Sequence, residues 1–260
     1  MQEYLVCSLY GPLCSWGDIA VGEVRPSTMH PAKSAVLGLL AAALGLKRPD
    51  TAPEETERTA LEAAHRAMAH GYGYAVRVDA PGTPLVDYHT IQVPPSGSGR
   101  NRRHFATRRD ELTTLPRSDL ATILSRREYR VDAYYTLALW PRAAVPYPLT
   151  VLAARLQEPT FPLYLGRKSC PLALPLAPRV VMADSIIAAM AQAQGRDDFL
   201  QPLLSPATRP ALYWDEDGEA GIPMEHTFTR RDAVHSRHRW QFMPRSERHG
   251  VLPPQEASDV

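Results

Sequence analysis

Proline is the residue that most constrains this chain, because it occupies 25 of the 260 positions. Each proline removes a backbone hydrogen-bond donor and resists the interior of a helix. A mainly helical protein is therefore excluded, and we expect an α+β chain with long irregular connections. The hydrophobic fraction of 44% suffices for a buried core, and the length allows one large domain or two small ones.

Hydrophobic periodicity predicts the elements of the first two thirds of the chain. In order they are a strand at 2–10, helices at 32–45 and 53–71, strands at 72–78, 84–93 and 127–140, a helix at 148–157 and a candidate closing strand near 162–165. This order matches the split β-α-β units of a ferredoxin-like domain, interrupted by one long excursion. We therefore expect such a domain over residues 1–175.

The last third is predicted to be rich in strands. Strands are expected at 179–183, 210–214, around 224–228 and at 233–242, with a helix at 184–194. Residues 176–260 then form either extra strands on the first domain or a small second domain, and the sequence leaves both arrangements open.

Cysteine usage and hydropathy predict a cytoplasmic protein without a membrane partner. The three cysteines are odd in number and none has CxxC spacing, and the chain has no signal peptide and no apolar run of about 18 residues. His235-x-x-His238 lacks a third ligand at a persuasive spacing, so no metal site is predicted. The nucleotide-binding and hydrolase motifs GxGxxG, HExxH and GxSxG are also missing, and no cofactor is expected.

Charge is distributed unevenly, although 29 cations and 28 anions give a formal net charge of only +1. Residues 100–130 carry nine cations against four anions, whereas residues 1–99 carry seven against ten. The basic segment lies in the predicted excursion, where Arg100, Arg102, Arg103, Arg108 and Arg109 surround His104 and Phe105. Arginines that bind phosphates beside a ring that stacks on a base favour single-stranded nucleic acid, the alternative being a solvated loop.

Three further loops carry residues suited to an anion or a base. Trp16 follows a glycine turn and is a candidate stacking platform, the alternative being a core residue. Arg25, Thr28, Lys33 and Ser34 surround the start of a buried helix, whose free N–H groups favour an anion unless Ser or Thr caps them. Arg167 and Lys168 follow Gly166, which permits close approach to a phosphate chain, the alternative being a solvated basic turn.

Four segments, in this order and spacing, go beyond composition. They are GPLCSWG at 11–17, RPSTMHPAKSAVLGLLAAALG at 25–45, DYHT at 87–90 and YLGRKSCPL at 164–172. Together they resemble the CasD family, the type I-E form of the fifth CRISPR-associated (Cas) family within the RAMP superfamily. The resemblance covers roughly residues 1–175.

The resemblance implies a noncatalytic subunit of the Cascade surveillance complex that binds the 5′ handle of the CRISPR RNA. A β-hairpin thumb, expected over residues 88–127, would protrude from the ferredoxin-like (RRM-like) domain and bend the guide. The backbone and large subunits of Cascade would be protein partners, and target DNA would be reached only through the complex. The candidate RNA-binding residues are Trp16, Arg25, Thr28, Lys33, Ser34, His89, Arg100, Arg102, Arg103, Arg108, Arg109, Arg167 and Lys168.

A metal-independent endoribonuclease that processes CRISPR repeat RNA is the alternative, because a type I-C relative cuts the precursor itself. Such cleavage needs a general base for the 2′-OH, a general acid for the leaving oxygen and a cation for the phosphorane. His30 and Lys33 stand three residues apart, and Tyr10 or His89 could join them. Type I-E systems normally assign this cutting to another subunit, so the noncatalytic interpretation is preferred and no catalytic residue is predicted.

Overall fold

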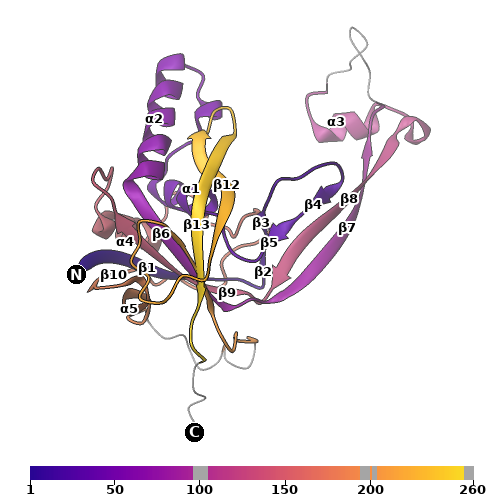
Figure 1. Cartoon of the computed structure of the whole chain (residues 1–260). Helices are drawn as coiled ribbons and strands as arrows, with labels where there is room; N and C mark the ends of the chain where they lie inside the picture. The colour runs from indigo at the N-terminus through magenta and orange to yellow at the C-terminus, as the bar shows by residue number, and fades with distance from the viewer. Residues whose placement is uncertain (96–104, 194–199, 201–203, 255–260) are drawn as a thin grey trace.

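A seven-stranded antiparallel sheet organises the molecule. The computed structural model of the chain describes residues 1–95, 105–193, 200 and 204–254, and the predicted α+β class is confirmed. The strand order is β10-β1-β9-β6-β11-β13-β12, and every neighbouring pair is antiparallel (Figure 1). The strands are β1 (Gln2–Tyr10), β6 (Tyr72–Ala80), β9 (Tyr134–Pro141), β10 (Arg179–Ala183), β11 (Ala211–Asp215), β12 (His226–Ser236) and β13 (Gln241–Val251).

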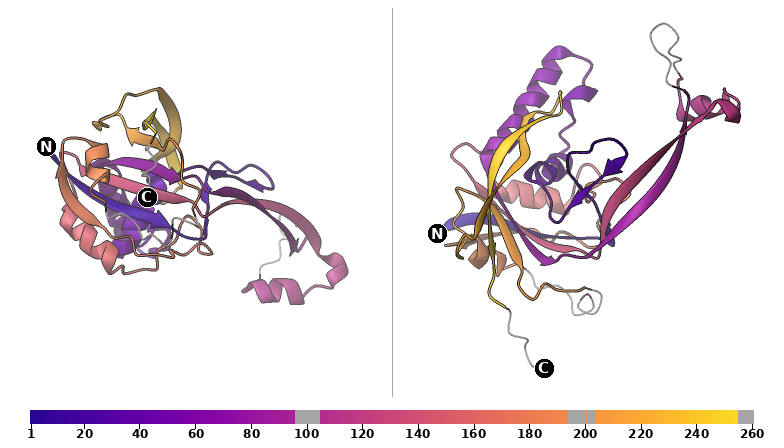
Figure 2. Two further views of the ribbon diagram at one scale, coloured as in Figure 1. Left: turned by 90° about the horizontal axis from the view of Figure 1, so that it is seen from below. Right: turned by 45° about the vertical axis from the view of Figure 1, so that its right-hand side comes forward.

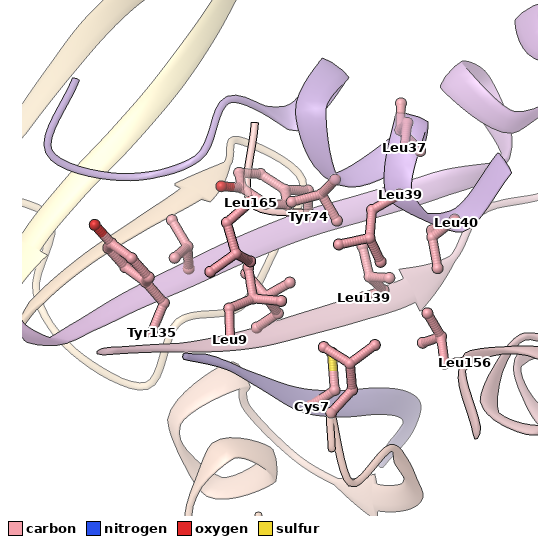
Figure 3. Packing of buried hydrophobic residues seen from close by; sticks show 14 of the residues in the cluster. Cys7, Leu9, Leu37, Leu39, Leu40, Tyr74, Tyr135, Leu139, Leu156 and Leu165 are labelled. Atoms are coloured by element: carbon pink, nitrogen blue, oxygen red, sulfur yellow. The ribbon is translucent and has the colours of Figure 1, made fainter. Parts of the chain in front are cut away.

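The larger core lies between one face of the sheet and the helices α1 (Lys33–Leu44), α2 (Glu55–Gly71) and α4 (Leu149–Gln157). Figure 3 shows Leu9, Tyr74 and Leu139 of the strands packed near leucines of α1 and near Leu156 of α4. The opposite face carries a smaller core with α5 (Ile186–Met190). Because both faces are covered, β1 is buried from Tyr4 to Tyr10, and in this stretch its sequence is apolar except for Ser8.

A long hairpin projects away from the sheet. Its strands β7 (Thr83–Val93) and β8 (Ala121–Val131) pair from Thr83–Val131 to Val93–Ala121, which spans about 35 Å. Along the chain, the short helices α3 (Arg108–Thr113) and η3 (Arg117–Asp119) come after β7 and before β8. Figure 2 shows the arm extending from the body of the molecule. The hairpin begins five residues before the predicted excursion of 88–127.

The inner half of the hairpin, from its root to its midpoint, is flanked by four short strands of the β1–α1 connection. β2 (Leu13–Cys14) and β4 (Val24–Arg25) both pair with β8, β4 in the parallel sense. β3 (Trp16–Gly17) and β5 (Ser27–Thr28) pair with each other. The connection is therefore folded against the hairpin and does not form an open loop.

Three sequence predictions of strands need correction. The strand predicted at 127–140 is two strands, because Asp132 has φ of 53° and the chain turns between β8 and β9. The segment 162–165 makes only an isolated bridge between Tyr164 and Pro171, and β10 instead pairs with β1. The C-terminal hairpin turns at 237–240, so β12 runs through the break predicted near 229–232.

The strands of residues 176–260 attach at both sides of the sheet. β10 pairs with β1, whereas β11, β13 and β12 continue the sheet beyond β6. In the described parts of the chain, no helix is long and apolar enough to cross a membrane.

Gly73→Ala should destabilise the protein, because Gly73 lies opposite Trp140 on β9 and an added Cβ would stand 1.9 Å from Cε2 of that ring. Displacing a buried ring costs about 1–3 kcal/mol. Gly17→Ala is the matched control, since its Cβ would meet nothing within 4 Å and should change stability by less than about 0.5 kcal/mol. Urea unfolding of both variants measures the difference, and equal midpoints would contradict the packing described.

Candidate nucleic-acid interface

Arginines gather along the inner half of the β7–β8 hairpin, between its root at Thr83–Val131 and its midpoint at Tyr88–Arg126. The pairing of β4 with β8 sets Arg25 beside Arg127 and Val24 beside Arg126, and the Arg126 N–H donates to the Glu23 carbonyl at 2.9 Å. The side chains of Arg25 and Arg126 are exposed, and Arg127 is half-buried. We call the four arginines Arg25, Arg126, Arg127 and Arg167 the hairpin-base cluster.

Arg167 reaches the cluster from a tight turn after α4. Its guanidinium lies 4.6 Å from the centre of the Tyr129 ring and 3.4 Å from the Arg25 carbonyl oxygen, to which it donates. Lys168 follows it and is exposed. Two of the predicted basic loops, at 25–34 and 164–172, are therefore brought together through Arg25 and Arg167.

Gly166 explains how this turn approaches so closely. Its φ is +87°, and an added Cβ would stand 1.9 Å from the Ser15 carbonyl oxygen. The Ser15 N–H in turn donates to the Leu165 carbonyl at 3.0 Å. We expected Gly166 to allow close approach to a phosphate chain, but in the structure it packs against the backbone of Ser15.

Trp16 is a core residue, which corrects its prediction as a stacking platform. Its side chain is 3% exposed and its ring meets the Tyr135 ring edge-on, with centroids 5.8 Å apart. Thr28 is partly buried in the same region, and its hydroxyl donates to the His30 carbonyl at 2.8 Å. Trp16 therefore does not present the face that a stacked base would need, whereas the role predicted for Thr28 stays a prediction.

Lys33 is likewise directed inward, which corrects its prediction as a phosphate contact. Its Nζ lies 2.5 Å from Oδ2 of Asp215, and its backbone N–H donates to Oδ2 of Asp232 at 2.8 Å. The anion at the start of α1 is therefore a carboxylate of β12, supplied by the chain itself. Ser34 lies half-buried in the first turn of α1.

The Lys33 contact belongs to a buried set of ion pairs that we call the Arg245 network. Asp215 also accepts from Arg142 at 2.8 Å and from Arg245 at 2.7 Å. Arg245 continues to Asp232 at 2.8 Å and to Glu247 at 2.7 Å. These groups adjoin a pocket of about 380 Å³ between α1 and the C-terminal strands.

The network shifts the pKa values of its members. Burial alone would raise the pKa of Glu247, but the hydrogen bond and charge of His30 and the charge of Arg245 outweigh it and lower the pKa to about 2. Burial lowers the pKa of Lys33, and Asp215 opposes that effect. Because each buried charge has a partner, the network holds the C-terminal strands against α1.

The residues of the cleavage hypothesis do not meet at one open site. His30 is 3% exposed, stacks on Tyr213 with centroids 3.9 Å apart, and holds Nε2 3.3 Å from Glu247. Tyr10 donates to Asp132 at 3.2 Å, and His89 on the hairpin pairs with Asp87. Lys33 is committed to Asp215, so these four residues do not place a general base and a general acid at a common space.

The predicted residues near the hairpin tip are described only in part. Arg108 contacts Glu111 and the Gln92 carbonyl, and Arg109 is exposed on α3. Arg100, Arg102, Arg103 and His104 lie outside the described residues. Phe105 is half-buried.

Sequence reasoning missed the strongest part of the surface. Arg126 and Arg127 were counted in a basic segment but not assigned to a site, and Tyr88, 56% exposed, stands directly across from Arg126. The alternation in SRREYRV and the aromatic residue in DYHT were the available signals. Arg130, by contrast, binds the Pro81 and Gly82 carbonyls and fixes the base of the hairpin.

The residues that the structure describes include no group of three or more His, Cys, Asp or Glu side chains that could hold a metal ion. What the site offers is an exposed hairpin with arginines along its inner half and an aromatic ring at its midpoint. This combination defines a class of candidate nucleic-acid-binding proteins built on an antiparallel sheet.

Comparison with known proteins is consistent with that class. The family model described as "CRISPR-associated protein (Cas_Cas5)" matches residues 4–246, so the chain belongs to the Cas5 family of CRISPR-associated proteins. It is 32% identical over 184 residues to the CRISPR system Cascade subunit CasD of Escherichia coli (strain K12), a match that covers 68% of this chain and 70% of the relative. The resemblance to the CasD family is thereby confirmed.

Two solved structures share the fold. A chain of a "CRISPR RNA-guided surveillance complex" aligns with a TM-score of 0.59 and 24% identity, covering 96% of this chain and 90% of that one. A "Crystal structure of Cas protein" aligns with a TM-score of 0.55 and 23% identity, covering 96% and 95%. The alignments span nearly the whole chain, including the C-terminal third that the sequence resemblance did not reach.

Glu247→Gln should flatten the acid dependence of the free energy of unfolding. Its folded pKa of about 2 lies below its ordinary value of 4.5, so its ionised form contributes stability that is complete above 4.5 and is lost as the pH falls toward 2. Removing this titration should reduce the slope by up to about 1.4 kcal/mol per pH unit in that window. Urea unfolding at several pH values measures the slope, and a variant with the wild-type slope would show that Glu247 is not held ionised.

Proposed function

We propose that this chain is a noncatalytic subunit of a CRISPR RNA-guided surveillance complex of the Cascade type, in which it binds and caps the 5′ handle of the CRISPR RNA. The observation that carries the proposal is the projecting β7–β8 hairpin with exposed arginines along its inner half. The names of the relative and of the solved complex support membership of such an assembly.

In this proposal the β7–β8 hairpin is the thumb, and β10, β1, β9 and β6 with their helices are the ferredoxin-like domain. The strand order β10-β1-β9-β6 supports this assignment, because it places the fourth, first, third and second strands of the β-α-β repeat side by side. The thumb leaves between the second and third of these strands. A protruding arm next to a bound strand is suited to bending the guide.

The RNA backbone would cross the hairpin-base cluster. Arg25, Arg126 and Lys168 are exposed and offer positive charge to successive phosphates. Tyr88 stands in register with Arg126 and offers a ring on which a base can stack, the role that Trp16 cannot fill. The contacts are therefore phosphate-directed with one stacking position, which is typical of single-stranded RNA binding.

The arm is also suited to contact other subunits. Both of its faces carry exposed apolar residues, and an isolated two-stranded hairpin is marginally stable in water. The exposed side chains include Leu85, Val86, Ile123 and Leu124. We assign these to contacts with the backbone and large subunits of the complex, through which target DNA would be reached in the cytoplasm.

A noncatalytic role agrees with the chemistry of the chain. His30 and Lys33, the pair that cleavage would require, are buried in ion pairs with Glu247 and Asp215. A general base must reach the 2′-OH within hydrogen-bond distance, but His30 is buried, and Lys33, although it lines the pocket, is held by Asp215.

Arg25→Ala combined with Arg126→Ala should weaken binding of RNA that carries the 5′ handle. Each phosphate contact contributes about 0.7 to the slope of log K against log salt for a single strand, so loss of two contacts should reduce the slope by about 1.4. Fluorescence anisotropy of a labelled handle RNA across a salt series measures both affinity and slope.

Arg155→Ala combined with Arg179→Ala is the matched control. Both side chains are exposed, and α4 and β10 lie on the side of the sheet away from the hairpin (Figure 1). This variant removes the same charge and should bind as the wild type does. Equal affinity, salt slope and complex assembly for the two double variants would overturn the proposed RNA surface.

A further inference from the structure

Trp240 differs from the other tryptophans of the chain. Trp16, Trp140 and Trp214 are 3%, 2% and 2% exposed, whereas Trp240 is 50% exposed in the turn between β12 and β13. Its φ is 53°, a left-handed conformation that costs about 1–3 kcal/mol for a bulky residue. A large ring held in the solvent by a strained backbone needs contacts that fix it there.

The turn is fixed by α2. The Glu62 carboxylate accepts the backbone N–H groups of Arg237 and His238, each at 3.0 Å, and the Ser236 hydroxyl accepts that of Arg239 at 3.1 Å. Burial tends to raise the pKa of Glu62, but these hydrogen bonds lower it, so the carboxylate stays ionised. The ring is therefore presented by a rigid turn.

Two guanidinium groups lie against the Trp240 ring. The Cζ atom of Arg237 is 4.7 Å from the ring centre and that of Arg48 is 5.3 Å. Arg48 also pairs with Asp50 at 2.8 Å. Burial, and then the charge of Arg48, lower the pKa of Arg237, which reflects crowding of positive charge.

Cations exceed carboxylates around the ring. The cations are Arg48 and Arg237 against the ring and Arg66 beside Glu62, and the carboxylates are Asp50 and Glu62. Glu62 accepts backbone N–H groups and Asp50 pairs with Arg48, and among the described residues Arg237 makes no ion pair within 4 Å of a carboxylate oxygen. A ligand that covers this surface must bring negative charge.

We propose that Trp240, Arg48 and Arg237 form a second binding site for single-stranded nucleic acid, separate from the hairpin-base cluster. One base contacts the exposed part of the indole ring, and the neighbouring phosphates bind the arginines. A strand supplies the missing negative charge at every nucleotide, whereas a protein partner would bury unpaired cations.

The site is set apart from the proposed thumb in the fold. The turn of β12–β13 lies beside α2, and the β7–β8 hairpin projects away from both of them in Figure 1 and in the right-hand view of Figure 2. The inference therefore does not depend on the handle-binding surface, and either can fail without the other. RNA and DNA share the required chemistry and are separated by experiment.

The distribution of tryptophans provides a direct test. Because three of the four are buried, acrylamide should quench mainly Trp240 in the full chain. Oligouridylate and oligothymidylate of about 12 nucleotides, which suits the usual site sizes, are added in separate titrations. Protection of Trp240 from acrylamide by either oligonucleotide supports the site and identifies the strand it takes, and protection by neither overturns it.

A variant series tests whether the ring contributes affinity. In the Arg25→Ala, Arg126→Ala background, Trp240→Leu should weaken oligonucleotide binding about five- to a hundredfold by anisotropy, whereas Trp240→Phe should retain most of it. Leu bears the same backbone strain as Trp, and an unchanged thermal midpoint confirms that the turn still folds. If Trp240→Leu binds the oligonucleotide as tightly as the background double variant does, the site is overturned. This outcome does not depend on how the background variant binds handle RNA.

Discussion

The ion pairs around Asp215 are the interaction on which the C-terminal half of the structure depends. One carboxylate accepts from Lys33 of α1, from Arg142 after β9 and from Arg245 of β13. Three segments far apart in sequence are thereby joined at a single buried side chain. Removing Asp215 would leave three cations short of a partner in a poorly solvated place, which is far more unfavourable than losing an exposed pair.

This network also determines which surfaces remain for ligands. Because Lys33, His30 and the start of α1 are saturated by Asp215, Glu247 and Asp232, the most polar part of the interior is unavailable to a phosphate. Positive charge on accessible side chains is instead found on the outside, along the inner half of one hairpin and at the turn of another. The division follows from the energetics of burial, since a charge can be buried only with its partner.

The sequence predicted local structure better than pairing. The apolar runs identified β1, α1, α2 and α4 within about two residues, because their burial leaves a periodic pattern. The site was harder to predict. Trp16 and Lys33 carry the right chemistry, but their burial depends on Tyr135 and Asp215, more than 100 residues away. Arg126 and Tyr88 become one surface only through the register of β7 with β8, which no local pattern specifies.

The attachment of the β7–β8 hairpin has a mechanical consequence. β2 and β4 pair with β8, the Arg130 guanidinium binds the carbonyls of Pro81 and Gly82, and the Asp132 N–H donates to the Pro12 carbonyl at 3.2 Å. Both strands of the arm are thus held by contacts where they join the rest of the molecule. The arm is therefore rigidly attached to the sheet. A force applied near its tip is transmitted to the sheet and does not bend a hinge at the attachment.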